Sequence, residues 1–148
     1  MLLEPKNDLL HLLNIIQSCE KIVLFSKEYT NYEDFYYDKK QMVFDACLML
    51  LQHTGESIKK VSEETKSQRT EIKWENIVGF RNRISHEYAF LNPKTVFKII
   101  KDEIPYLSNA CYEIVKDYVE KGIFDKDEIA FASKHEFYDL VNFNIIIN

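Results

Sequence analysis

Apolar residues recur every three or four positions in four stretches of this chain, the spacing that places them on one face of an α-helix. These stretches cover about 7–29, about 39–60, a third beginning near Trp74, and about 93–121. Only three glycines and three prolines occur among the 148 residues, so little interrupts such helices and few residues suit strand-joining turns. The pattern predicts an all-α protein.

Short links between long helices favour antiparallel neighbours, so we expect a four- to five-helix antiparallel bundle. A chain of 148 residues has the size of one domain and can bury a core without metals or disulfides. We therefore expect a single domain over 1–148, with its core at about 5–121. The remaining segment, about 122–148, is predicted to be a helical extension that Asp125, paired with Glu128, begins as a capping pair.

Several single residues predict where the helices begin, bend or end. Asn92 is a suitable N-cap, and Pro93 suits the first helical position because its missing N–H would be unpaired there. Pro105 is expected to kink the fourth helix near Glu103. Gly55 stands where another backbone could approach the second helix closely. The polar segment 62–70, SEETKSQRT, is expected to be a mobile link.

Composition argues against several classes of protein. No CxxC pair occurs and no histidines are close in sequence, so we expect neither a metal site nor a cofactor. The longest apolar runs are far shorter than the ~20 residues that cross a bilayer, and the first ten residues lack a signal-peptide pattern. We expect a soluble, cytoplasmic protein with three reduced cysteines, which are Cys19, Cys47 and Cys111.

Charge is unevenly distributed along the chain. The formal net charge is -5, which is not typical of a nonspecific polyanion binder. The window 59–83, however, holds seven basic and four acidic residues, a local charge of +3 against -8 for the rest. Such a window is either a solvated helical face or a local site for phosphates.

One stretch combines several chemically active side chains, the segment RNRISHEY at 81–88. On an ideal helix, Asn82 and His86 stack at i, i+4, while Arg81, Ser85 and Tyr88 align at i, i+4, i+7. His86 would then lie about 140° around the axis from Arg81, although a long arginine can swing toward Asn82. A compact site is easier to build where two copies of this helix meet.

These residue types suit RNA cleavage. Attack of a ribose 2'-hydroxyl on its own phosphate needs a group that takes the hydroxyl proton and a cation that stabilises the growing phosphoryl charge. His86 could move the proton, Arg81 could bind the phosphate, and Asn82 could hold the substrate or the His86 ring. Arg83, Lys73 and Ser85 are candidate RNA-phosphate contacts. Spacing alone also fits a charge-and-cap cluster at a helix end.

The segment from Gly55 to Asn109 resembles the HepT-like toxin family of the HEPN superfamily. The family's hallmark is an arginine, four residues, a histidine, any residue and a tyrosine, which Arg81, His86 and Tyr88 match. Asn82 supplies the polar residue that often follows the arginine. The tryptophan before the motif, the GFRN turn and the downstream IPYL also match.

This resemblance implies a homodimeric helical bundle in which both motifs face a shared cleft and act as a metal-independent ribonuclease. It further implies the toxin of a type VII-like toxin-antitoxin pair that acts on RNA, with transfer RNA as one candidate substrate. The partner would be a minimal nucleotidyltransferase antitoxin of the MntA type, which transfers AMP from ATP to the motif tyrosine, here Tyr88. A bulky anion beside Arg81 and His86 would block the phosphate site.

Two alternatives remain open at this stage. In the first, the chain is a noncatalytic subunit that binds a nucleotide or substrate for a nucleotidyltransferase and uses the same cleft only to hold a phosphate. In the second, it is a helical interaction module whose motif stabilises the dimer. In that case Tyr88 is simply a packed aromatic residue at the end of a helix.

Overall fold

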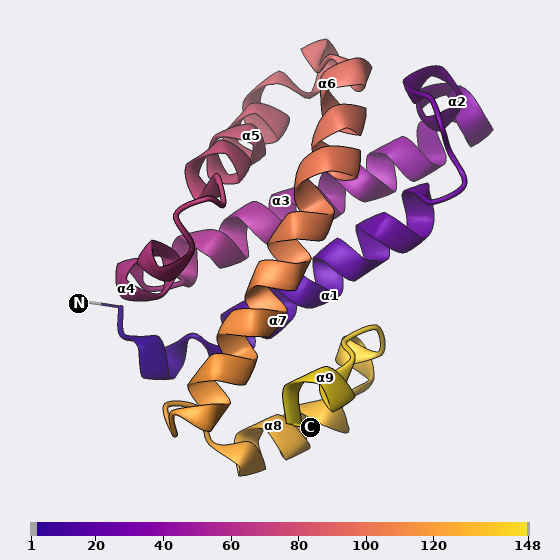
Figure 1. The fold of residues 1–148 in the computed structure, drawn as a ribbon. Helices are drawn as coiled ribbons and strands as arrows, with labels where there is room; N and C mark the ends of the chain where they lie inside the picture. The colour runs from indigo at the N-terminus through magenta and orange to yellow at the C-terminus, as the bar shows by residue number, and fades with distance from the viewer. Residues whose placement is uncertain (1–2, 148) are drawn as a thin grey trace.

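The computed structural model describes residues 3–147 and contains no strand within them, which confirms the all-α prediction (Figure 1). Four helices are long, namely α1 (Leu9–Ser26), α3 (Met42–Lys60), α5 (Trp74–Glu87) and α7 (Ile104–Glu120). The shorter ones are α2 (Tyr32–Tyr37), α4 (Glu63–Lys66), α6 (Pro93–Lys98), α8 (Lys126–Ser133) and α9 (Phe143–Ile147).

The long helices pack in sequence around α1, which contacts both α3 and α7, while α5 packs on α3. In Figure 1, α3 runs back along α1, and α7 crosses both on its way to the C-terminal helices. One continuous apolar core extends from Leu9 in α1 to Ile146 in α9. This arrangement leaves α5 at the side of the bundle with one face on α3.

Helix α1 is long and apolar enough to cross a membrane by length and composition, but 56% of it is buried inside the fold. It carries buried polar side chains as well, including Gln17 and Ser26. A helix that packs against other helices and buries polar side chains among them is typical of the centre of a helical bundle. We therefore interpret α1 as a core helix.

The three cysteines are buried and free, as expected for packed core residues. Burial raises the pKa of the Cys47 thiol to about 12 and also raises the pKa values of the Cys19 and Cys111 thiols, because a thiolate is poorly solvated in the core. None of these thiols is suited to act as a nucleophile.

Most of the predicted helix boundaries are confirmed. The Asn92 side chain accepts a hydrogen bond from the Lys94 N–H at 2.9 Å, with Pro93 as the first residue of α6. Asp125 caps α8 by accepting from the Asp127 N–H at 2.8 Å. Near Pro105 the helix does change, since a π-helical turn at Ile99–Glu103 joins α6 to α7. A π-turn admits one extra residue and so relieves the helix at the proline.

The prediction of a mobile link at 62–70 is wrong. Ser62 caps α4, and a 3-10 turn follows at Ser67–Arg69. The buried Asp8 carboxylate explains this order, because it accepts hydrogen bonds from the Ser62 N–H at 3.0 Å and from the Ser62 and Thr65 hydroxyls at 2.6 Å each. Both hydroxyls are buried, although the segment is polar in sequence and most of its other residues are exposed.

Two further boundaries differ from the prediction. The second helix begins at Met42 rather than near Lys39, because Lys39, Lys40 and Gln41 have φ values of 50°, 56° and 70° and cannot continue a right-handed helix. The last predicted helix ends early, at Ser133, and a 3-10 turn follows at Glu136–Tyr138.

The C-terminal extension docks on α1 and α7 through specific hydrogen bonds. Buried Gln17 of α1 donates to the Asp139 carboxylate at 2.8 Å and accepts from the Leu140 N–H at 3.0 Å. The Tyr138 hydroxyl donates to Asn14 at 2.6 Å, also on α1. The apolar tail of the extension is anchored too, since Ile146 of α9 is buried.

Candidate active site

Helix α5 carries the motif and is held on α3 by its apolar face. The predicted stripe is confirmed, because Trp74, Ile77, Phe80 and Ile84 are all buried. The Trp74 indole N–H is shared between the carbonyls of Lys66 and Arg69 and so fixes the start of the helix. The polar residues of 81–88 are left at the opposite, C-terminal end of α5.

Gly55 allows α3 and α5 to approach closely beside Arg81. A Cβ atom at Gly55 would lie 2.5 Å from the Arg81 Cβ and 3.0 Å from its Cγ. The stem of the arginine therefore rests on bare α3 backbone, and the close approach predicted for Gly55 is confirmed.

A row of polar contacts follows along the junction of the two helices. The Tyr88 hydroxyl donates to Asp45, the Gln52 amide donates to the Ser85 hydroxyl at 2.9 Å, and Arg81 Nε contacts Glu56 Oε1 in an ion pair. The predicted alignment of Arg81, Ser85 and Tyr88 is thus observed, but these side chains face α3. We call these three pairs the α3–α5 polar seam.

Arg81 also reaches the second predicted strip. Its Nη1 donates to the Asn82 side-chain oxygen at 3.1 Å, which joins the two residues across the helix surface. Asn82 and His86 are both exposed. Among residues 3–147, no hydrogen bond or ion pair holds the His86 side chain, so its ring is accessible to a ligand. Arg81 therefore contacts Asn82, and the exposed His86 lies one turn further along α5.

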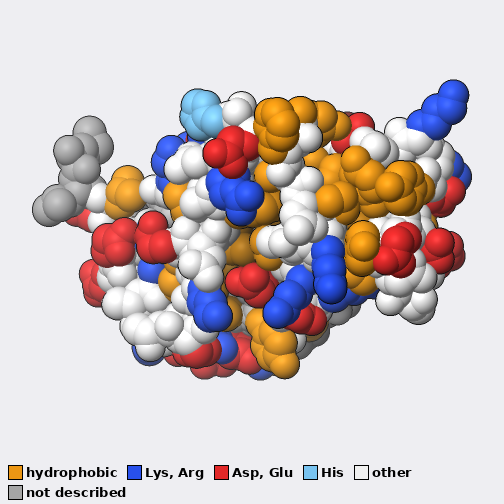
Figure 2. Space-filling model, turned by 90° about the horizontal axis from the view of Figure 1, so that it is seen from above, with side chains coloured by type: hydrophobic (Ala, Val, Ile, Leu, Met, Phe, Trp, Pro, Cys, Tyr) orange, Lys and Arg blue, Asp and Glu red, His pale blue; other side chains and the backbone are white. Residues whose placement is uncertain are grey.

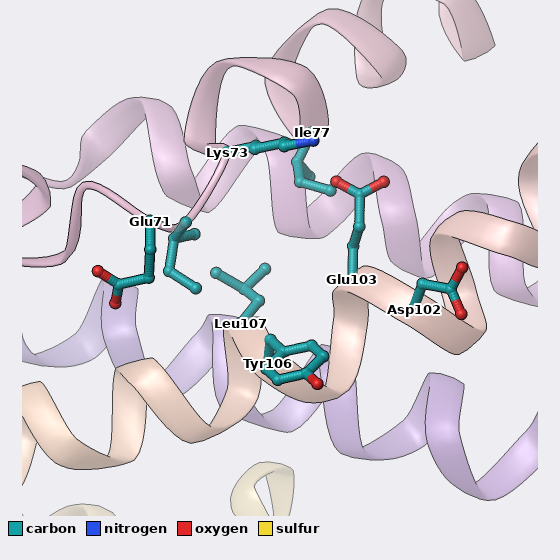
Figure 3. A pocket seen from close by; sticks show the side chains of 8 residues that line it. Glu71, Lys73, Ile77, Asp102, Glu103, Tyr106 and Leu107 are labelled. Carbon is teal, nitrogen blue, oxygen red and sulfur yellow. The ribbon is translucent and has the colours of Figure 1, made fainter.

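Arg83 and Lys73 are in different surroundings. Arg83 is exposed near the motif, where it pairs with Glu87 at 3.4 Å and lies 5.9 Å from the centre of the Phe80 ring. Lys73 precedes α5, and thirteen residues of helix put it roughly 20 Å from His86. It lines a groove of about 240 Å³ whose other charged residues are the acids Glu71, Asp102 and Glu103 (Figure 3). The structure does not bring Lys73 to the motif.

Carboxylates shape the electrostatics of the seam. The hydrogen bond to Asp45 raises the pKa of Tyr88, because ionising the phenol would place two anions side by side. Tyr88 is nevertheless 50% exposed, so half of the residue is open to solvent while its hydroxyl is bonded to Asp45. The described residues contain no group of three His, Cys, Asp or Glu side chains that could hold a metal ion.

Sequence reasoning missed the α3 half of this arrangement. Asp45, Gln52 and Glu56 are spaced i, i+7, i+11, which puts them on one helical face. That spacing could have identified a polar stripe on the second helix, but nothing local indicates that the motif helix packs there. A hollow of about 170 Å³ beside the seam is lined by Met49, Gln52, His53 and Glu56.

The comparisons with known proteins place this site in a family. The model of the family described as "Ribonuclease HepT-like" matches residues 15–114, which include α3, α5 and the whole motif. The chain belongs to the HepT-like ribonuclease family. The family match ends before the extension at 122–148, so the docked C-terminal helices lie outside it.

Named relatives agree with this assignment. The chain is 29% identical over 118 residues to "Putative RNase MJ0125" of Methanocaldococcus jannaschii, which covers 79% of this chain and 99% of that protein. It is 30% identical over 97 residues to "Probable ribonuclease HepT" of Thermococcus cleftensis, covering 66% and 86%. A protein of Caldanaerobacter subterraneus, "Putative RNase TTE0752", is 29% identical over 106 residues, covering 72% and 92%. No solved structure matches the chain.

Proposed function

We propose that this HepT-like protein is the endoribonuclease toxin of a type VII-like toxin-antitoxin pair. The observation that carries the proposal is the open edge of α5, where Arg81 is hydrogen-bonded to Asn82 and the unpaired ring of His86 is exposed. A flexible RNA strand can reach all three groups. Family membership supports a ribonuclease, and the geometry supports these residues as its active groups.

In the proposed reaction a ribose 2'-hydroxyl attacks the adjacent phosphorus. His86 accepts the hydroxyl proton as the O–P bond forms, and the bond to the 5'-oxygen breaks. The 5'-oxygen leaves with a proton, so the products are a 2',3'-cyclic phosphate and a 5'-hydroxyl. Arg81 stabilises the charge on the phosphoryl oxygens, and Asn82 holds the substrate. Ser85 and Arg83 contact neighbouring phosphates. Lys73 would contact a phosphate only in an RNA long enough to extend to the start of α5.

A second copy of the chain would complete this site. Exposed apolar side chains lie on α3 and just after the motif, where Met42 and Met49 are each 57% exposed and Phe90 is 87% exposed. Figure 2 shows uncovered apolar side chains bordered by acidic and basic ones on the upper face of the molecule. A homodimer that covers the α3 and Phe90 side chains would bring two copies of α5 together and supply the proton donor for the leaving oxygen.

Tyr88 is the proposed site of control. Transfer of AMP by a nucleotidyltransferase antitoxin of the MntA type forms a bond between the phenol oxygen and the α-phosphorus of ATP and releases pyrophosphate and a proton. The 50% exposure of Tyr88 supports this step, and the added phosphodiester would lie two residues along the chain from His86. A mass increase of one adenylyl group on the Tyr88 peptide, absent in Tyr88→Phe, is the expected result with ATP and the antitoxin.

Cleavage of total RNA by purified protein in EDTA tests the ribonuclease. Loss of the proton-transfer group in His86→Ala should reduce cleavage by about 10²–10⁴-fold. His135→Ala is the control, because His135 lies in the extension and is also exposed. Cyclic phosphate ends in the wild-type products support the proposed reaction.

Two outcomes would contradict the proposal. Wild-type protein that cuts no RNA would favour a noncatalytic subunit that only binds a nucleotide or substrate. Cleavage retained by His86→Ala, together with a lower melting temperature, would favour a motif that only stabilises the dimer.

A further inference from the structure

The residue beside Gly55 on α3 has a specific relation to the arginine of the motif. Glu56 Oε1 contacts Arg81 Nε, and both atoms are buried. We infer that Glu56 is a positioning residue for Arg81, which fixes the guanidinium so that its terminal nitrogens face an RNA phosphate. This inference rests on the proposed ribonuclease function and adds a residue outside the motif to it.

The geometry assigns different tasks to the nitrogens of Arg81. An arginine side chain has five N–H donors, one on Nε and two on each terminal nitrogen. Nε lies against Glu56, and one Nη1 proton is donated to Asn82 at 3.1 Å. The three remaining donors are all on the two terminal nitrogens, and these two nitrogens can bind a phosphate through bidentate hydrogen bonds.

Burial explains why Glu56 stays in place. Neither Arg81 Nε nor Glu56 Oε1 makes an aligned hydrogen bond with a described residue, so each has lost water without gaining a good hydrogen bond. The opposite charge of the partner is what compensates for that loss. Glu56 Oε1 also lies 3.8 Å from Lys59 Nζ, so the cost of separating the pair falls mainly on the buried Arg81 Nε, and this favours keeping the arginine stem against Gly55.

A carboxylate beside an active arginine could instead mask it by competing with the phosphate. A masking carboxylate would be expected to bind the terminal nitrogens, where a phosphate would bind. Glu56 contacts the inner nitrogen instead, and the Arg81 side chain remains 24% exposed. The contact therefore favours positioning over masking, and the two roles predict opposite effects when the carboxylate is removed.

Steady-state cleavage by Glu56→Ala and Glu56→Gln separates the two roles. Positioning predicts that kcat falls by about 10–100-fold in Glu56→Ala, because a small displacement of a phosphate-binding group is costly. Glu56→Gln should fall less, since its amide oxygen can still meet Nε. KM should stay the same or decrease, because one negative charge near the phosphate is removed.

Asp117→Ala is the matched control. Asp117 carries the same charge, has a side chain that is 39% exposed and pairs with the exposed Lys121 at 2.8 Å at the end of α7, outside the motif. Its removal should change kcat by less than about twofold, as expected for an exposed ion pair. A kcat that rises or stays unchanged in Glu56→Ala would overturn the inference in favour of masking or of no role.

Nuclear magnetic resonance of the arginine Nε–H groups tests the inference without relying on cleavage. The Arg81 signal, assigned by its absence in Arg81→Lys, should exchange with water at least tenfold more slowly than that of Arg83 and should lose this protection in Glu56→Ala. If the wild type cuts no RNA, the proposed function fails, but this measurement still decides the inference. Equal exchange for Arg81 in wild type and Glu56→Ala would refute it.

Discussion

Replacing Gly55 by alanine should push the motif helix away from α3. The new Cβ would lie 2.5 Å from the Arg81 Cβ and 3.3 Å from the carbonyl oxygen of Ile77. Non-bonded carbon atoms prefer about 3.5–4.0 Å, so α5 must move by roughly 1 Å. Neither of these atoms can rotate away, because one is backbone and the other is attached to it.

The expected cost follows from two opposing effects. Overpacking costs about 1–3 kcal/mol, and alanine is about 0.5–1 kcal/mol more favourable than glycine in a helix. The net change therefore ranges from about zero to a loss of about 2.5 kcal/mol, or up to roughly 10 °C in Tm for a domain of this size. Cleavage should suffer more than stability, because displacing Arg81 by roughly 1 Å can reduce kcat by about 100-fold.

Gly79→Ala provides the comparison within the motif helix. A Cβ at Gly79 would meet nothing within 4 Å, so the same chemical change should stabilise the protein by about 0.5–1 kcal/mol and leave cleavage unchanged. Thermal melting and RNA cleavage of both variants are the measurements. A Gly55→Ala protein that melts no lower than Gly79→Ala and cuts RNA at the wild-type rate would refute the argument that close packing positions Arg81.

Two further predictions concern other polar contacts. Asp45→Asn should lower the raised pKa of Tyr88 toward its ordinary value, measured as phenolate absorbance against Tyr88→Phe. Tyr88 has a higher pKa in the folded state than in the unfolded state. The contact with Asp45 therefore stabilises the fold fully below about pH 10, and this stabilisation is lost as the pH rises through the folded pKa. The Tm difference between Asp45→Asn and wild type should vanish there. Asp8→Ala should lower the free energy of unfolding by about 3 kcal/mol, since it leaves donors of Ser62 and Thr65 unpaired. A change of less than about 0.5 kcal/mol in denaturant unfolding would contradict this account.

The sequence predicted the elements whose signals are local. The apolar period located the long helices, and the cap at Asn92 marked the start of one of the helices. The motif strip was also predictable, because Arg81 and Tyr88 are spaced to share one face of a helix. These features depend only on residues within a few turns of one another.

What could not be predicted depends on contacts far apart in the chain. Segment 62–70 has the composition of a loop, and the buried partners that its hydroxyls find outside the segment are more than fifty positions away, the Asp8 carboxylate and the Tyr118 hydroxyl. Glu56 and Asp45 are ordinary surface acids in sequence. They become part of the site because the buried face of α5 selects one side of α3, and that choice is made by the packing of the whole core.

The docked extension limits how this protein can assemble. Its hydrogen bonds to Gln17 and Asn14, and a further one from the Asn142 N–H to the Tyr112 hydroxyl at 2.8 Å, occupy a shared surface of α1 and α7. The chain thus fills with its own residues a place that a neighbouring subunit could otherwise take. The homodimer proposed above must therefore use another surface, and the side of α3 and α5 that carries the motif remains available to it.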